Sequence, residues 1–402
     1  MEQGLASKRD SLYNYTVTFF LYATLIVDLY RKTIAVNSTM IRNVVYIGCL
    51  LLILRDAQKH KRLPHMLLVG SVMSLLYWIS SFIYPGHNQI FFSAWLMFVS
   101  RLWPAYYIGR YTEDWAGVSH RVRKFILFAL LYAMIAFTST VFDIAGLNST
   151  YATIASNLFF VVWIAFYDSF KSHKIIPIII CLVCFLPVLF LGTRAGMFGA
   201  LLALVLYFGR VINRSNAQKK ALYYMLLFIG AITIITTFGL MSHYLLDILP
   251  NSRTLNALLS GNIFDDSNRS EGFYSKMYAS FEQNPLKMHG LIGNQIYLAG
   301  DNASADVIMS SFAHNVYLEL CMNFGVIIGI FMGLYFTIVL IRAYLKSKWR
   351  KEDVEFVFLG VLGMTFVGML VSYSWLFQYE VWMLFGMAYG VIRNKRMYKL
   401  NT

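Results

Sequence analysis

Charged residues are scarce in this sequence. Asp, Glu, Lys and Arg make up 13% of the chain, against about a quarter in soluble domains, whereas 58% of the residues are apolar. An ordinary soluble surface is excluded, because it needs more charge than this. The aromatic content of 17% is typical of proteins that anchor at two lipid–water interfaces. The composition therefore predicts an integral membrane protein.

Cysteine is also rare, and its four residues are too few for a disulfide framework. Cys181 and Cys184 form a CxxC pair within the apolar run IIICLVCFLP, which favours packed thiols over a metal or redox site. The acidic residues are scattered without ligand spacing, and no Walker loop is present. We therefore expect no metal, no cofactor and no nucleotide motor.

The net charge of +14 could suggest nucleic acid, but such a partner needs basic residues clustered on one face. Here they fall in short runs between apolar segments, which is the pattern that sets membrane topology. About 20 apolar residues cross a bilayer as a helix, and by this measure the chain has about 12 spans. They lie near 12–30, 40–54, 66–84, 89–109, 124–146, 149–168, 174–192, 195–212, 221–247, 314–341, 354–373 and 376–392.

The basic runs alternate between the two sides of the predicted membrane. They lie at 8–9, 55–62, 110–124, 171–174, 210–220, 342–351 and 393–399, all on one side, with Arg31 and Lys32 as exceptions. Because basic residues stay on the inner side, both termini are predicted to be cytoplasmic, and an even number of spans follows. The first apolar run lacks a small-residue cleavage site, so we expect no cleaved signal peptide.

One long polar connection, at 249–313, then lies outside, which is the periplasm in a Gram-negative cell. Within it, residues 270–283 place Phe273, Met277 and Phe281 on one helical face, and Pro285 follows as a stop. This predicts an amphipathic helix, either at the membrane surface or against the bundle. Residues 1–402 otherwise read as a single polytopic membrane domain.

Five polar residues are conspicuous for where they lie. Arg101 interrupts a span, Arg194 stands at the external junction of two spans, and Arg269 opens the amphipathic helix. His314 and Asn315 stand where the external loop re-enters the membrane. Two guanidiniums can hold a pyrophosphate, and a neutral histidine beside them can take a proton from an attacking hydroxyl.

Each residue also has a structural alternative. Arg194 could reach the external headgroups, Arg269 could pair with neighbouring acids, and Arg101 could hold helices together by binding Asp28 or Asp143. His314 and Asn315 could cap a helix. After them, Gly325, Gly329 and Gly333 recur every four residues, which predicts close packing of the His314 helix against another helix.

Four stretches in order carry a resemblance to a known family. LGTRAG at 191–196, NRSEGFYSKMYASF at 268–281, NPLKMHGLIG at 284–293 and FAHNVYLELCMNFGVIIG at 312–329 resemble the O-antigen ligase and polymerase superfamily. The resemblance covers roughly residues 185–335. Each motif alone is weak, but their order across one external loop is more specific.

The resemblance implies a GT-C-like glycosyltransferase that needs no metal and inverts the anomeric carbon. Its donor would be a glycan linked to undecaprenyl pyrophosphate, used at the periplasmic face of the bacterial inner membrane. Arg194 and Arg269 would hold the pyrophosphate, His314 would be the base, and Asn315 and Arg101 would be further substrate-binding candidates. A chain-length regulator and a flippase are the partners that the resemblance implies.

Two activities fit the resemblance. A polymerase transfers the growing chain to a lipid-linked repeat unit, and a ligase transfers it to lipid A–core. The pattern FAHNVYLEL is closer to that of polymerases, which is the reading we favour. A polysaccharide flippase is the alternative from another class, but it would line its path with cations through the whole bilayer. The candidates here cluster instead on the external face.

Overall fold

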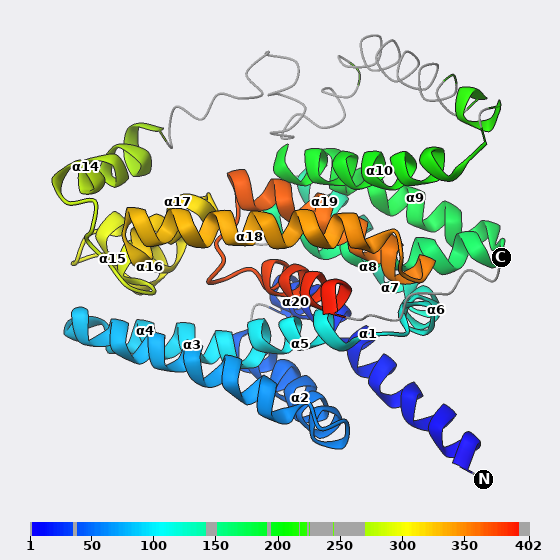
Figure 1. The fold of residues 1–402 in the computed structure, drawn as a ribbon, viewed down its shortest axis with the longest axis horizontal. Helices are drawn as coiled ribbons and strands as arrows, with labels where there is room; N and C mark the ends of the chain where they lie inside the picture. The colour runs from blue at the N-terminus through cyan, green and yellow to red at the C-terminus, as the bar shows by residue number, and fades with distance from the viewer. Residues whose placement is uncertain are drawn as a thin grey trace.

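The described part of the chain is a bundle of helices without any strand (Figure 1). The structure, a computed structural model, describes residues 2–34, 38–141, 151–190, 194–216, 218–222, 225, 244 and 270–393. An α-helical membrane protein was the predicted class, and the described residues confirm it, since they form only helices and include apolar helices long enough to span a bilayer.

The first half contains helices of 9 to 33 residues. Its elements are α1 (Glu2–Ile34), α2 (Ser38–Lys59), α3 (Leu63–Ile83), the turn η1 (Pro85–His87), α4 (Asn88–Met97), the π-helical turn η2 (Phe98–Leu102), α5 (Trp103–Tyr111), α6 (Trp115–Lys124), α7 (Ile126–Val141), α8 (Tyr151–Lys171), α9 (Ile175–Phe190) and α10 (Arg194–Arg214).

The second half begins with short helices and ends with long ones. Its elements are the π-helical turn η3 (Ser270–Tyr274), α14 (Ser275–Gln283), α15 (Gly293–Ala299), α16 (Ala305–Ser310), α17 (Val316–Phe324), α18 (Val326–Ser347), α19 (Glu352–Val371) and α20 (Tyr379–Arg393). The prediction of a helix over 270–283 is confirmed, as η3 followed by α14.

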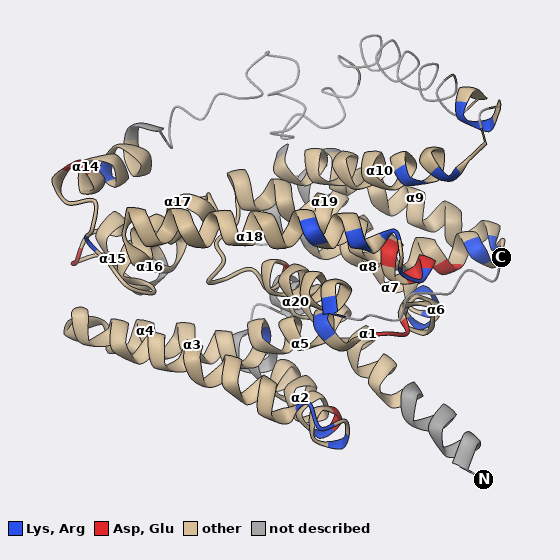
Figure 2. Cartoon of the chain, in the orientation of Figure 1, with Lys and Arg blue, Asp and Glu red and all other residues tan. Residues whose placement is uncertain are grey.

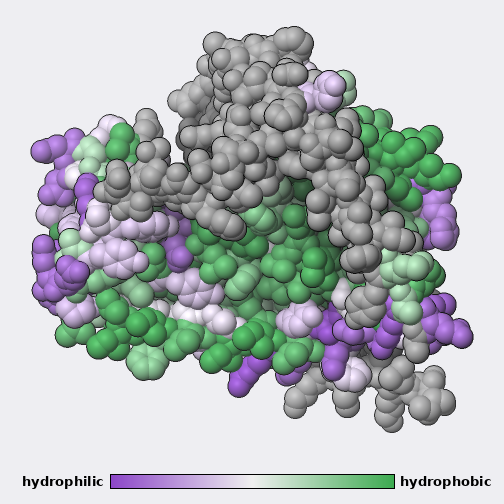
Figure 3. All heavy atoms as spheres, turned by 90° about the horizontal axis from the view of Figure 1, so that it is seen from above, coloured by the Kyte–Doolittle hydropathy of each residue, from purple (hydrophilic) through white to green (hydrophobic). Residues whose placement is uncertain are grey.

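Four described helices are long and apolar enough to cross a membrane, and these are α3, most of α10, α18 and α19. Large apolar side chains are exposed along one face of α3, where Leu68, Leu75 and Phe82 recur every seven residues. On the face shown in Figure 3, hydrophobic residues occupy the visible middle and hydrophilic residues gather toward both ends. Exposed leucine and phenylalanine in such numbers fit a lipid-facing surface.

Charge divides the two ends of the bundle (Figure 2). The basic end holds most Lys and Arg drawn, and there Arg214 of α10 forms a 2.6 Å ion pair with Glu355 of α19. The loop end, with α14, α15, α16 and α17, lies opposite and carries few charges. This separation agrees with the alternation of basic runs in the sequence, although the sidedness itself stays a prediction.

Most predicted spans coincide with described helices, and one is broken into two helices. The span predicted at 89–109 is a continuous passage through α4, η2 and α5. The span predicted at 314–341 is wrong as a single helix, because it is broken at Gly325 into α17 and α18. Gly325 has a φ of 79°, a conformation that only glycine adopts readily. Most of the span predicted at 221–247 lies outside the described residues.

The two helices on either side of Gly325 fold back on each other. Tyr317 near the start of α17 bonds through its hydroxyl to Thr337 of α18, with the oxygens 3.1 Å apart. A Cβ at Gly333 would lie 2.8 Å from the Tyr317 ring, and one at Gly329 would overlap the backbone of Cys321. The predicted role of the glycine stripe is therefore confirmed for these two residues, with α17 itself as the partner.

Two further predictions concern packing. Cys181 and Cys184 are buried free thiols of α9, as expected for packed side chains. The amphipathic helix lies against the bundle, because Met277 of α14 is buried with Leu298 of α15 and Met322 of α17. Phe273 and Phe281, the other two residues of the predicted face, pack on the same cluster.

Candidate functional site

His314 lies at the loop end, in the segment between α16 and α17. Its backbone has a φ of 52°, in the left-handed region that residues with a Cβ seldom occupy. The ring of Phe312 lies 4.2 Å from the imidazole and that of Phe273 lies 6.3 Å from it, both measured between centroids. The residue is partly exposed. A strained backbone that presents a partly exposed imidazole is the kind of outlier found at functional sites.

Asn315 caps the helix that follows. Its side-chain oxygen accepts hydrogen bonds from the backbone N–H groups of Tyr317 at 2.9 Å and Leu318 at 3.1 Å. Its amide nitrogen donates to the carbonyl of Leu370, near the end of α19, at 2.8 Å. The structural alternative for Asn315 is thus confirmed, since N-capping by asparagine satisfies N–H groups that a helix start leaves unpaired. Contact with a substrate stays a prediction.

The backbone of Arg194 lies at about the same height along the bundle as the end of α19, to which Asn315 bonds. Helices α10 and α19 run antiparallel, because Gly199 abuts Met364 while Arg210 is 3.4 Å from Glu355 at the other end. If this antiparallel register is extended from Gly199 to the start of α10, Arg194 lies opposite Leu370, the residue to which Asn315 bonds. The fold therefore brings the first residue of α10 toward His314, although the side chain of Arg194 lies outside the described part.

Arg269 lies outside the described residues. The element that begins directly after it, η3, ends beside the site, since Phe273 of η3 is the ring 6.3 Å from His314. Three of the sequence motifs, around Arg194, Phe273 and His314, therefore converge at the loop end of the bundle.

Arg101 belongs to a different environment. It lies in the π-helical turn η2, where its guanidinium stacks over Tyr379 of α20 at 4.7 Å and Tyr46 of α2 at 5.6 Å. It also interacts electrostatically with the buried carboxylate of Glu380. These contacts join three helices and support the structural alternative. Glu380 is a partner that sequence reasoning missed, while the side chains of Asp28 and Asp143 lie outside the described part.

Sequence reasoning also missed a buried carboxylate on α17. Glu319 is fully buried, and its two oxygens accept hydrogen bonds from Gln295, Ser374 and the backbone of Trp375. These donors come from α15 and from the connection between α19 and α20. Because α17 is nine residues long and does not span the membrane, Glu319 belongs to the loop end. Burial raises the pKa of its carboxyl to about 7, and bonds from Ser374, Trp375 and Asn294 oppose the rise.

A second polar centre lies beside this one. In the amide orientation that satisfies its neighbours, Asn323 donates to the Gly290 carbonyl and to Asn294, both at 3.0 Å, and accepts from the Trp375 indole at 3.1 Å. The backbone N–H of Gly290 donates in turn to the Asn323 carbonyl at 3.0 Å. These bonds tie the loop 284–292 to the end of α17.

His289 holds the same loop from the other side. One ring nitrogen pairs with the Tyr84 hydroxyl at 3.1 Å and the other with the Ser280 hydroxyl at 3.0 Å. Burial, with a smaller contribution from Lys287, lowers the pKa of His289 to about 4, so the ring is neutral at neutral pH. With both nitrogens engaged in the interior, His289 is a structural residue. The single signal for it was its place in the NPLKMHGLIG stretch.

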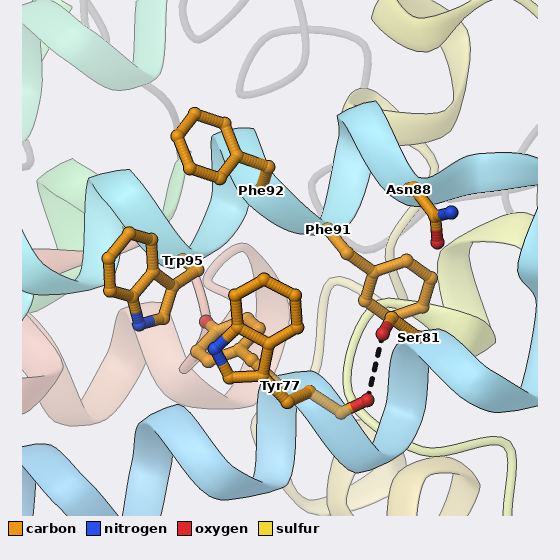
Figure 4. Close-up of a pocket in the computed structure, with 7 residues that line it drawn as sticks. Tyr77, Ser81, Asn88, Phe91, Phe92 and Trp95 are labelled. Atoms are coloured by element: carbon orange, nitrogen blue, oxygen red, sulfur yellow. Dashed lines mark hydrogen bonds between the residues drawn. The ribbon is translucent and has the colours of Figure 1, made fainter.

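A small pocket lies between α3 and α4 near the same end (Figure 4). Aromatic rings dominate its lining, which consists of Tyr77, Trp78, Ser81, Asn88, Phe91, Phe92 and Trp95. Its volume of about 30 Å³ has room for water molecules, since each needs about 10–15 Å³, but not for a sugar. The pocket is therefore not a substrate cavity in this conformation.

The described residues contain no group of three or more His, Cys, Asp or Glu side chains placed to hold a metal ion. Metal independence stays a prediction. The described residues place His314 at the loop end, with the backbone of Arg194 and the element that follows Arg269 nearby, and the catalytic roles of these residues stay predictions. No protein-family model matches the chain, and none of the curated proteins gives a significant match.

Proposed function

We propose that the protein is a membrane glycosyltransferase of the O-antigen polymerase type. It would transfer a growing glycan from undecaprenyl pyrophosphate to a lipid-linked repeat unit. The observation that carries the proposal is the placement of His314 on strained backbone at the loop end, tied through Asn315 to α19 level with Arg194. The motifs around these residues are those in which the sequence resembles the family.

The proposed reaction is a direct displacement. The acceptor hydroxyl oxygen attacks the anomeric carbon of the donor while His314 takes the hydroxyl proton. The bond between that carbon and the pyrophosphate oxygen breaks, and the electron pair leaves with the lipid pyrophosphate. Arg194 and Arg269 offset the negative charge on the leaving group. The product has inverted configuration, and no metal takes part.

The proposal places the whole molecule in the bacterial inner membrane with about 12 spans and both termini in the cytoplasm. The loop end faces the periplasm and receives the pyrophosphate head groups, while the prenyl tails stay in lipid. The separation of charge along the bundle supports this orientation, because basic residues gather opposite the loop end (Figure 2). The lipid tails require a lateral opening toward the bilayer.

The first test is turnover by purified protein in nanodiscs, with a lipid-pyrophosphate-linked repeat unit as the only substrate. A ladder of longer lipid-linked glycans is the expected result. Product that forms only after addition of lipid A–core would establish a ligase instead. Absence of product in both assays, with movement of the substrate across a vesicle membrane, would establish a flippase and overturn the proposal.

The same assay tests the base. We expect His314→Ala to lower the rate of chain extension by about a hundredfold or more, because general base catalysis is worth roughly 10²–10⁴. Substrate binding should be retained. The matched control is His87→Ala, which removes a partly exposed histidine from the turn between α3 and α4. Equal loss in both variants would contradict the role of His314.

A further inference from the structure

Glu319 is the ionisable group most completely enclosed at the loop end. Its side chain has no exposed surface, and it stands on α17 five residues after His314. A carboxylate in such a place is costly unless hydrogen bonds compensate its lost hydration. Neither the base nor the pyrophosphate-binding role of the proposed mechanism uses it, so its presence needs another account.

We infer that Glu319 is a positioning residue, which fixes the start of α17 and thereby the orientation of the His314 imidazole. The inference rests on the proposed function of His314. It follows from where the donors to Glu319 come from. One oxygen accepts from Gln295 of α15 at 3.1 Å and from the Ser374 hydroxyl at 2.7 Å, and the other accepts from the Trp375 N–H at 3.1 Å.

Through these bonds Glu319 connects three segments: α17, α15 and the connection between α19 and α20. Helix α17 is held to α15 on one side and to the connection after α19 on the other. Asn315, at the start of the same helix, is bonded to Leu370 at the end of α19. His314 therefore precedes a helix that is fixed to α19 and its following loop at two points, a cap and a buried carboxylate. Loss of either point lets the imidazole move relative to α10.

The chemistry of the donors explains why an acid is needed. The Trp375 N–H and the Gln295 amide nitrogen can only donate, and they face different oxygens of Glu319. Glutamine has the same shape as glutamate but only one side-chain oxygen. Its NH₂ group would therefore face either the Trp375 N–H or the Gln295 NH₂ group, and two donors cannot bond to each other. The Gln295 oxygen has no hydrogen-bond partner among the described residues, and a rotated Gln295 amide can receive the new N–H. Glu319→Gln should therefore fold while losing part of the clamp.

The neighbouring groups are neutral. From α15 they are Asn294 and Gln295, and from the connection after α19 they are Ser374 and Trp375. From α3, Tyr77 interacts electrostatically with Glu319, and its buried hydroxyl has no partner among the described residues. No described cation is among the groups that shift the Glu319 carboxyl. Hydrogen bonds and not an ion pair therefore hold it.

The test compares Glu319→Gln with wild type by two readouts. In the extension assay we expect kcat to fall about tenfold or more with KM nearly unchanged, because a small misplacement of a base costs rate without removing substrate contacts. A purely structural residue would lower the yield of folded protein and leave the kcat of the folded fraction intact. Wild-type kcat in folded Glu319→Gln would overturn the inference.

The second readout needs no turnover. Diethyl pyrocarbonate carbethoxylates histidines, and mass spectrometry of peptides gives the rate at each site. We expect the rate at His314 to rise by up to about tenfold in Glu319→Gln, since one lost hydrogen bond shifts a local opening equilibrium by that factor. The rate at His87 should not change. An unchanged His314 rate would contradict the inference even if the wild-type protein makes no polymer, so the two failures are distinguishable.

A milder variant covers the case in which Glu319→Gln does not fold. Ser374→Ala removes the shortest of the three bonds and leaves the carboxylate in place. We expect both readouts to change in the same direction and by less, because one neutral donor is lost. No change in either readout would count against Glu319 as a positioning residue.

Discussion

The two histidines of the loop end lie in different environments, and the difference favours His314 as the proposed base. His289 is buried, has partners at both ring nitrogens and has its pKa lowered to about 4. His314 is partly exposed on left-handed backbone, near the rings of Phe312 and Phe273. A general base must reach substrate and exchange a proton with it. Of the two, His314 meets these requirements.

The arginines of the proposed site can be tested one residue at a time. We expect Arg194→Ala and Arg269→Ala each to lower chain extension by about ten- to a hundredfold, the worth of a charge-assisted hydrogen bond to a developing charge. Lysine at either position should restore part of the rate, because a point charge lacks the bidentate geometry of guanidinium. The measurement is the initial rate of the ladder assay at saturating substrate.

The control for this prediction is Arg253→Ala, which removes one positive charge from 249–313, the connection that is predicted to be external and that also contains Arg269. Its rate should stay near that of wild type. Full activity of both Arg194→Ala and Arg269→Ala would rule out the pyrophosphate assignment. Equal loss in all three variants would indicate a general effect of loop charge and not two specific contacts.

At the residue scale, the sequence predicted which end of the bundle the candidate residues occupy better than it predicted the side chains that they contact. The motif order located His314, Asn315 and Arg194, and the fold brings their backbone to one end. The partners of Arg101 were missed, because Tyr379 and Glu380 are far away in sequence and carry no local signal. Glu319 was missed for a related reason. A single glutamate in an apolar segment indicates that burial of its carboxylate costs free energy. The sequence does not show which hydrogen-bond donors offset that cost, because they lie on other segments.

At the scale of elements, the hairpin of α17 and α18 supports the proposed site. Glycine at two positions lets α17 lie directly on α18, and Asn315 and Glu319 then fix α17 to its other neighbours. A hydrophobicity count over 314–341 gives one long span because both helices are apolar. The break depends on the backbone at Gly325, where the N–H of the next residue, Val326, donates to the Pro285 carbonyl at 2.8 Å.

A matched pair of glycine substitutions tests this packing. Gly329→Ala places a Cβ on the backbone of Cys321, so we expect it to lower the stability of the folded protein by about 1–3 kcal/mol, as overpacking does. Gly48→Ala, in helix α2, meets nothing within 4 Å and should be neutral or stabilising, because alanine favours a helix by about 1 kcal/mol over glycine. The measurement is the thermal unfolding midpoint in detergent, followed by tryptophan fluorescence.

The test depends on whether the unfolding midpoint of each variant is lower or higher than that of wild type. A lower midpoint for Gly329→Ala beside an equal or higher midpoint for Gly48→Ala would confirm that α17 rests on α18. A midpoint for Gly329→Ala as high as that of Gly48→Ala would contradict the hairpin. The extension rate of Gly329→Ala should fall as well, since the helix that begins after His314 is displaced.

At the scale of the whole molecule, the order of basic residues along the chain agrees with their place in the fold. The basic runs alternate along the sequence, and in the fold Lys and Arg gather at the end opposite α14 and α15 (Figure 2). Composition and span length were enough to predict the all-helical class. The sequence could not predict that α14 packs on α15 and α17. An amphipathic helix can bury its apolar face either in a membrane surface or against other helices, and its sequence pattern is the same in both cases.

The orientation of the molecule can be measured with single cysteines and a membrane-impermeant maleimide. The native Cys49, Cys181, Cys184 and Cys321 are buried, so they should label slowly in the folded protein. Gly86→Cys lies in the turn between α3 and α4, and Glu282→Cys lies on an exposed position of α14. Lys174→Cys lies in the turn between α8 and α9, at the other end of the bundle.

In spheroplasts we expect the first two cysteines to be labelled at once and Lys174→Cys to be labelled only after the membrane is permeabilised. The physical reason is that a chain with its basic runs held inside leaves the loop end outside. The reverse pattern would place His314 in the cytoplasm, where a periplasmic polymerase cannot act, and would overturn the proposed function together with the orientation. Labelling of Gly86→Cys and Glu282→Cys on opposite sides would instead contradict the fold, because the loop that follows α14 is bonded to the end of α3 through Ser80 and Tyr84.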